Sequence, residues 1–172
     1  MGTYPVVIDL PSEYLTGIGR VASTFAFLET ELRNTSFAAL KLSPKHGRTA
    51  VRTPRMHETV AMIRELLSLD AIHVKTDLKK LEKLVERLEK ARDVVCHCIW
   101  IEGPDGKPWL QDLTGTWQPD PKAPPVRRRA HPEGIRINLS AFEEMAKLNV
   151  AAAAMTAKLR GEIQEAHKQA SP

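Results

Sequence analysis

Apolar residues recur every three or four positions in four separate stretches of this chain, and this spacing constrains the fold more than any other sequence feature. Side chains three and four positions apart share one face of an α-helix, so each stretch predicts a helix with one buried stripe. The four predicted helices run from the N-cap Ser12 to Ser43-Pro44, from Thr53-Pro54 to about Asp70, from Thr76-Asp77 to about Ile99, and onward from a capping box of Ser140 and Glu143.

The segments between these helices carry other signals. A loop is predicted at residues 45–48, between the first two helices. At Ile99 the period changes, and the pattern indicates two short strands around a turn centred on Asp105-Gly106, with a possible third strand at 135–137. Residues 118–134 hold five of the twelve prolines, which favours an extended loop.

An antiparallel bundle is the architecture that buries four such stripes together. With 172 residues, the chain has the size of one domain and needs no disulfide or metal to hold a core. We therefore predict a single all-α domain over residues 1–172, an antiparallel helical bundle of four long helices. A β-hairpin and a Pro/Arg-rich loop at 99–138 form an insertion between the third and fourth helices.

Composition excludes several function classes. No apolar run approaches the roughly 20 residues of a membrane span, and the polar start does not resemble a signal peptide. Cys96 and Cys98 are too close in sequence for an ordinary disulfide, so a reduced, cytoplasmic protein is expected. Neighbours such as Cys96, His97 and Cys98 cannot easily converge on one ion, and no Gly-rich phosphate loop is present, so no metal and no cofactor is predicted.

Positive charge gathers in two segments of a chain whose formal net charge is +4. Residues 41–64 hold six basic residues against Glu58 alone, and residues 120–136 hold five against two acidic ones. Such segments could contact phosphates if they meet in space, and otherwise they are solvated loop charge. The Lys/Glu-rich face of the third helix is expected to be a solvated face. The candidate nucleic-acid-binding residues are Arg48, Arg52, Arg55, Arg127, Arg128 and Arg129.

One motif stands out at the end of the third predicted helix, where Arg92 and Asp93 precede His97. RNA can be cut by attack of its own 2′-hydroxyl on phosphorus, which requires proton transfer and stabilisation of charge. Imidazole exchanges protons near neutral pH, and the guanidinium fork binds phosphoryl oxygens. We therefore assign His97 as acid/base, Arg92 as phosphate clamp and Asp93 as the residue that orients the imidazole, with Glu29 as a candidate to position Arg92 from the first helix.

The spacing Arg92-x4-His97 resembles the motif of HEPN domains, helical bundles that include many metal-independent endoribonucleases. The acidic residue within the apolar segment 25–32 of the first helix is similar to that family as well, and the resemblance covers residues 12 to about 100 and the last helix. It implies cleavage of single-stranded RNA by 2′-hydroxyl transesterification, in the role of a toxin or defence effector. It also implies a homodimer with both Arg92–His97 pairs at the shared interface, and an antitoxin or regulatory partner.

Two alternatives stay open. In the first alternative, Arg92 is a solvated charge and His97 caps the last turn of the helix. The chain is then a non-catalytic HEPN-like module that binds a protein partner or nucleic acid. The second concerns geometry: residues five apart on a helix point about 140° from each other. From this we expect that the helix breaks near Cys96 or that a second copy supplies the missing group.

Overall fold

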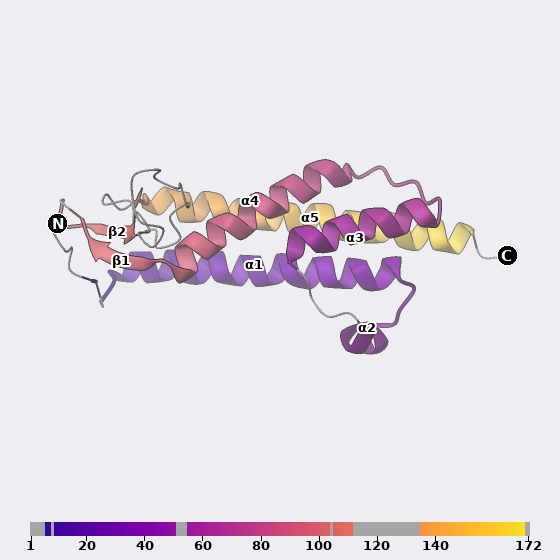
Figure 1. Cartoon of the computed structure of the whole chain (residues 1–172), viewed down its shortest axis with the longest axis horizontal. Helices are drawn as coiled ribbons and strands as arrows, with labels where there is room; N and C mark the ends of the chain where they lie inside the picture. The colour runs from indigo at the N-terminus through magenta and orange to yellow at the C-terminus, as the bar shows by residue number, and fades with distance from the viewer. Residues whose placement is uncertain (1–5, 8, 51–54, 104, 112–134, 171–172) are drawn as a thin grey trace, which may run out of the picture.

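The computed structural model describes residues 6–7, 9–50, 55–103, 105–111 and 135–170 (Figure 1). Its described part is all-α apart from one small antiparallel sheet, as the sequence predicted for the fold class. The elements in chain order are α1 Ser12–Ala39, α2 Pro44–Ala50, α3 Met56–Leu69, α4 Leu78–His97, β1 Ile99–Glu102, β2 Pro108–Gln111, β3 Ile135–Arg136 and α5 Leu139–Gln169.

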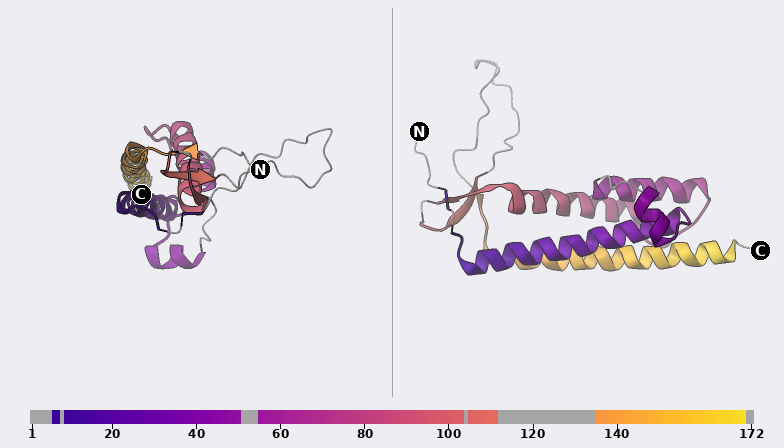
Figure 2. Two further views of the ribbon diagram at one scale, coloured as in Figure 1. Left: turned by 90° about the vertical axis from the view of Figure 1, so that its left-hand side faces the viewer. Right: turned by 90° about the horizontal axis from the view of Figure 1, so that it is seen from below.

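The longest helices, α1 and α5, lie side by side and run in the same direction, with α3 and α4 over one side of the pair (Figures 1 and 2). The Asn149 amide donates to the Val21 carbonyl at 3.4 Å, and further along Thr35 donates to the Thr156 carbonyl at 3.2 Å, so residue numbers rise together on both helices. The predicted antiparallel arrangement is therefore wrong for α1 and α5. An apolar stripe specifies the buried face of a helix but not its direction.

Only α4 opposes the other long helices. Along α3 and α4, His57 contacts Glu89 and Arg64 contacts Glu82, so residue numbers rise on one helix as they fall on the other. The helices are also unequal, because α3 has 14 residues against 28 in α1 and 31 in α5. The described part thus contains five helices of mixed length, where the sequence predicted four long ones.

The additional helix, α2, occupies the segment 45–48 that was expected to be a loop. Pro44 has no N–H to lose in the first turn of a helix, and the Gly47 N–H donates to the Ser43 carbonyl at 2.8 Å. Gly47 also brings its backbone against the ring of Phe37, where an added Cβ would lie 2.4 Å from ring carbons. Gly47, which suggested a loop, instead allows α2 to pack closely against Phe37 of α1.

Helix starts differ from the predictions by one or two residues. Pro11, not Ser12, is the N-cap of α1, and α5 begins at Leu139 without a side-chain cap, which leaves Ser140 inside the helix. The start predicted at Asp77 is confirmed, since its side chain accepts from the Lys80 N–H at 3.0 Å. The predicted cap Thr53-Pro54 lies outside the described residues.

Two apolar clusters hold the molecule together. The larger lies among α1, α3, α4 and α5, and its fully buried members include Leu28, Val60, Leu81 and Leu159. The smaller seats the sheet on one end of α1 and α5 through three rings, with Tyr14 edge-on to Trp100 at 5.6 Å and to Phe142 at 6.0 Å. This second cluster fixes where α4 ends. Of the helices that the structure describes, none combines the length and apolar content that a membrane crossing requires.

The sheet follows directly from the end of α4. β1 pairs with β2 through Trp100 and Leu110, and β2 pairs with β3 through Leu110 and Ile135. Gly106 has a φ of 70°, a left-handed conformation that glycine adopts without strain, so the predicted turn at Asp105-Gly106 is confirmed.

Candidate active site at the end of α4

The last residue of α4 is His97, and the helix is continuous up to it. Cys98 leaves the helical conformation, with φ −77° and ψ 154°, while its N–H still donates to the Val94 carbonyl at 3.2 Å. The helix stops there because Trp100 is buried against the smaller cluster, which commits the chain to β1. The helix therefore continues through Cys96, where the sequence geometry had predicted either a break near Cys96 or a group supplied by a second copy.

Arg92, Asp93 and His97 nevertheless meet. The Nη1 atom of Arg92 lies 2.8 Å from Oδ1 of Asp93 and 3.1 Å from Nε2 of His97. The expectation that one helix cannot bring Arg92 and His97 together is wrong, because it considered only the directions in which Cα–Cβ bonds leave the helix. The arginine side chain is long enough to reach along the helix surface to the imidazole.

The contact constrains the proton on His97. A guanidinium has only donors, so Nε2 must accept, and the lone pair of Nε2 then faces Arg92. Asp93 contacts the guanidinium rather than the imidazole, so it orients Arg92 and not His97, contrary to the role assigned from sequence. The site thus has one guanidinium at its centre, held by a carboxylate on one side and offered to an imidazole on the other.

A third partner of Arg92 comes from α1. The Arg92 Cζ atom lies 5.1 Å from the centroid of the Phe25 ring, within the range of a cation–π contact. Phe25 is buried in the larger cluster, so its ring is a fixed surface under the guanidinium. No sequence signal distinguished Phe25 from the other apolar residues of the α1 stripe.

Glu29 does not fill the role expected of it. Its carboxylate pairs with Arg33 of the same helix at 3.0 Å, and among the described residues no hydrogen bond or ion pair joins it to Arg92. Arg33 is four positions from Glu29 on α1, the spacing at which two helical side chains lie side by side. The Glu29 carboxylate therefore forms its ion pair with Arg33.

The polar side chains of the candidate site are accessible to solvent. The Arg92 side chain is 36% exposed and that of Asp93 is 59% exposed, so a polymer could reach both. Burial raises the pKa of the Cys96 thiol above its usual value of 9.0, the charge of Arg92 opposes the rise, and Asp93 adds to it. The thiol is therefore protonated at neutral pH and is a poor nucleophile.

Within the part of the chain that the structure describes, no three His, Cys, Asp or Glu side chains group closely enough to hold a metal ion.

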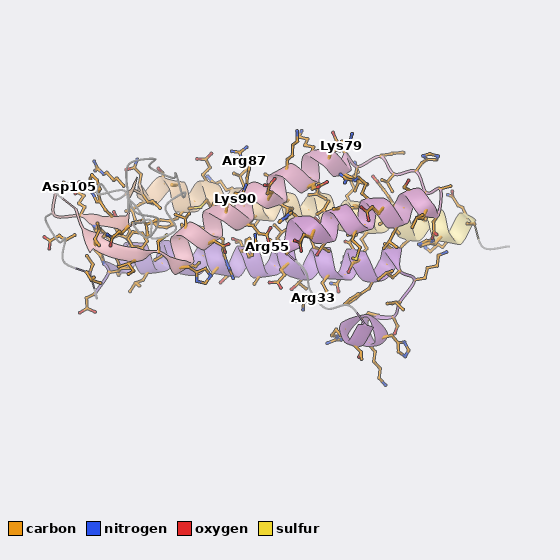
Figure 3. All side chains as sticks on the ribbon, in the orientation of Figure 1. Arg33, Arg55, Lys79, Arg87, Lys90 and Asp105 are labelled. Carbon is orange, nitrogen blue, oxygen red and sulfur yellow. The ribbon has the colours of Figure 1, made fainter. Side chains whose placement is uncertain are left out.

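Two of the predicted nucleic-acid-binding residues, Arg48 and Arg55, fall within the part of the chain that the structure describes. Arg48 is exposed on α2, which projects from the bundle away from the sheet, and its Nε donates to the Pro44 carbonyl at 3.2 Å. Arg55 is exposed at the start of α3 (Figure 3). Arg52 and Arg127–Arg129 lie outside the described residues.

The charges of α4 are arranged in a way that sequence analysis missed. Its glutamates all have partners: Glu82 pairs with Arg64, Glu86 with Lys90 at 2.7 Å, and Glu89 with His57 at 2.5 Å. Glu89 also accepts from the Met56 N–H at 2.9 Å and so caps α3. Four exposed cations on α4 form no ion pair within the described ranges; these are Lys79, Lys80, Lys83 and Arg87. In the sequence, acidic and basic residues alternate along α4. Packing against α3 places Glu82 and Glu89 on one side of the helix and leaves these cations on the other.

Comparison of the chain with family models, with curated proteins and with solved structures found no match.

Proposed function

We propose that this protein is a metal-independent endoribonuclease that cleaves single-stranded RNA at the Arg92–His97 site. The observation that carries the proposal is the 3.1 Å contact between Nη1 of Arg92 and Nε2 of His97 at an exposed helix end. It joins a proton acceptor to a phosphate-binding group, and these are the two functions that RNA transesterification needs.

In the proposed reaction, RNA supplies the nucleophile. Nε2 of His97 takes the proton of the 2′-hydroxyl as the 2′-oxygen attacks phosphorus. Arg92 turns its Nη1 donor from Nε2 to the phosphoryl oxygens and stabilises their developing charge. The bond from phosphorus to the 5′-oxygen breaks, and that oxygen takes from His97 the proton that Nε2 accepted from the 2′-hydroxyl. The products are a 2′,3′-cyclic phosphate and a 5′-hydroxyl, and every proton and electron pair is accounted for without a metal.

Asp93 and Phe25 support this role through Arg92. The Asp93 carboxylate binds the guanidinium from the side, and the Phe25 ring lies beneath it. Both contacts restrict the conformations of the Arg92 side chain, so less conformational entropy is lost when it binds a phosphate. Both are positioning residues, since neither contacts the imidazole in the described structure.

The proposal includes a cytoplasmic homodimer, with a toxin or defence role and an antitoxin or regulatory partner, as the HEPN resemblance implies. Arg92 and His97 meet within one chain, so a two-fold axis beside α4 would double the positive charge facing RNA rather than complete the site.

A second candidate function is a non-catalytic helical module that binds a protein or a nucleic acid. The observation in its favour is that Asp93, His97 and Phe25 already engage the guanidinium of Arg92, as in a structural cap of α4. Such a cap would matter for stability and not for chemistry.

Incubation of the pure protein with single-stranded RNA in EDTA tests the first function. We expect fragments that end in a cyclic phosphate or its 3′-phosphate product. Activity that disappears with the chelator and returns with a metal would overturn this mechanism, and no cleavage of any RNA would favour the module.

A further inference from the structure

The outer face of α4 presents a line of positive charge that ends at the candidate active site. At about 100° per residue, positions 79, 83, 90 and 97 fall within about 40° of one another around the helix axis. They span about 27 Å at 1.5 Å per residue. Lys79, Lys83 and Lys90 therefore lie in line with His97, and Lys79, Arg87 and Lys90 are seen along α4 in Figure 3.

The carboxylates of α4 do not cancel this charge. Glu82 and Glu89 turn toward α3, where their side chains are 26% and 17% exposed. Glu86 neutralises only Lys90. Lys79, Lys83 and Arg87 remain exposed without ion pairs in the described part of the chain, and charges free of protein partners can bind phosphates without first breaking a salt bridge.

An apolar groove of about 220 Å³ opens beside this line, between α4 and α5. Its walls include Leu84, Leu88, Met145 and Leu148, with Arg87 on one rim and Glu144 on the other. Apolar walls can hold the faces of one unstacked base away from water, and a carboxylate can accept from an exocyclic amino group. Arg87 lies between the groove and the line of lysines, so one ligand can contact both.

We infer that the outer face of α4 and the groove beside it form a binding track that leads single-stranded RNA to His97. Phosphates bind Lys79, Lys83 and Arg87, and one base enters the groove. The identity of the polymer as RNA rests on the proposed function. The preference for a single strand rests on the groove, because a base of a duplex would have to leave its stack and its pair, at an energetic cost, before it could enter the groove. This track replaces α2, on which Arg48 was expected to bind nucleic acid.

The charge of the track is tested with the full chain and a fluorescent 12-nucleotide 2′-O-methyl RNA, which binds as RNA does but has no hydroxyl to attack. The variant Lys79→Gln/Lys83→Gln/Arg87→Gln is compared with Arg20→Gln/Lys45→Gln/Lys147→Gln, which removes the same charge from exposed positions of α1, α2 and α5. We expect the α4 variant to bind at least about tenfold more weakly and its salt slope to fall by about 2, near 0.7 per lost phosphate contact. Binding unchanged in the α4 variant, or weakened equally in both, overturns the track.

The groove is tested without a change of charge. Ala141 lines it on α5, so Ala141→Leu fills space, and Ala151→Leu makes the same change at an exposed position of the same helix. We expect Ala141→Leu to weaken single-strand binding several-fold, with the salt slope unchanged, and Ala151→Leu to have no effect. Equal loss of affinity for a duplex of the same length overturns base insertion.

Failure of the track and failure of the proposed function give different results. If the parent cleaves RNA and the α4 variant binds and cleaves as the parent does, the function stands and the track is wrong. If the α4 variant alone loses binding but no RNA is ever cleaved, the track stands and the nuclease is wrong.

Discussion

Phe25 on α1 supports Arg92 on α4: the guanidinium carbon lies 5.1 Å from the ring centroid, over a side chain that is only 6% exposed. The two residues are far apart in sequence and belong to different helices, so the packing of α1 on α4 determines where the candidate phosphate clamp lies.

Phe25→Leu should slow RNA cleavage several-fold to about tenfold, because an aliphatic side chain keeps most of the core volume but removes the cation–π contact. Phe37→Leu is the matched control, since Phe37 is equally buried but packs on Gly47 near α2. Both variants should lose some stability, which thermal melting measures. Equal rates for the two variants, after correction for the folded fraction, would show that the ring does not position Arg92.

His97→Ala and Arg92→Ala should each abolish cleavage and leave the melting temperature within a few degrees of the parent. Both side chains lie outside the two apolar clusters, so their loss opens no cavity. Arg33→Ala is the control, because Arg33 has a similar exposure, 37% against 36% for Arg92, and pairs with Glu29 rather than with the site. A variant of the motif that unfolds the protein supports the structural cap instead.

A hybrid of an Arg92→Ala subunit with a His97→Ala subunit should remain inactive in RNA cleavage. Arg92 and His97 meet within one chain, so neither subunit of the hybrid carries a complete pair. Light scattering first establishes whether the parent has about twice the mass of its 19.2 kDa chain. Recovery of activity in a purified hybrid would instead show that the site is shared across a two-fold axis.

Glu89→Ala should lower the free energy of unfolding by about 1–3 kcal/mol, because it leaves the Met56 N–H at the start of α3 without its acceptor and removes the partner of His57. Glu86→Ala, three positions earlier on α4, should have little effect, since the Glu86 side chain is about half-exposed and its ion pair is with Lys90. Urea unfolding curves of both variants provide the comparison. Similar losses would mean that Glu89 does not cap α3.

Cys96 should make stability depend on pH in the alkaline range. Its pKa is raised by burial above the usual 9.0, so the unfolded chain releases the thiol proton at lower pH than the folded protein does. This contribution is present below pH 9.0 and is lost as pH rises through the folded pKa. Cys96→Ala should show a smaller fall in unfolding free energy above pH 9 than the parent. Parallel pH profiles for the two proteins would contradict the assignment to this thiol.

Local patterns in the sequence were sufficient for several features. The stripe containing Leu28 and Leu32, the side-chain cap at Asp77 and the turn at Gly106 are each specified by residues within a few positions, and all three appear in the structure. The segment at Gly47 was misread for the same reason. Its meaning depends on the ring of Phe37, which only folding brings beside it.

The helical class, the buried faces of the helices and the presence of Arg92 and His97 at one helix end could all be predicted from the sequence. Helical period and capping are properties of neighbouring residues, so they can be read without knowing the fold. Tertiary structure decided the parallel course of α1 and α5, the partners of Glu29 and Glu89, and the ring of Phe25 beneath Arg92. It also separated the charges of α4, because packing against α3 draws Glu82 and Glu89 to one side and leaves Lys79, Lys83 and Arg87 facing water. These are contacts between residues distant in sequence, and their energies depend on which helix faces which.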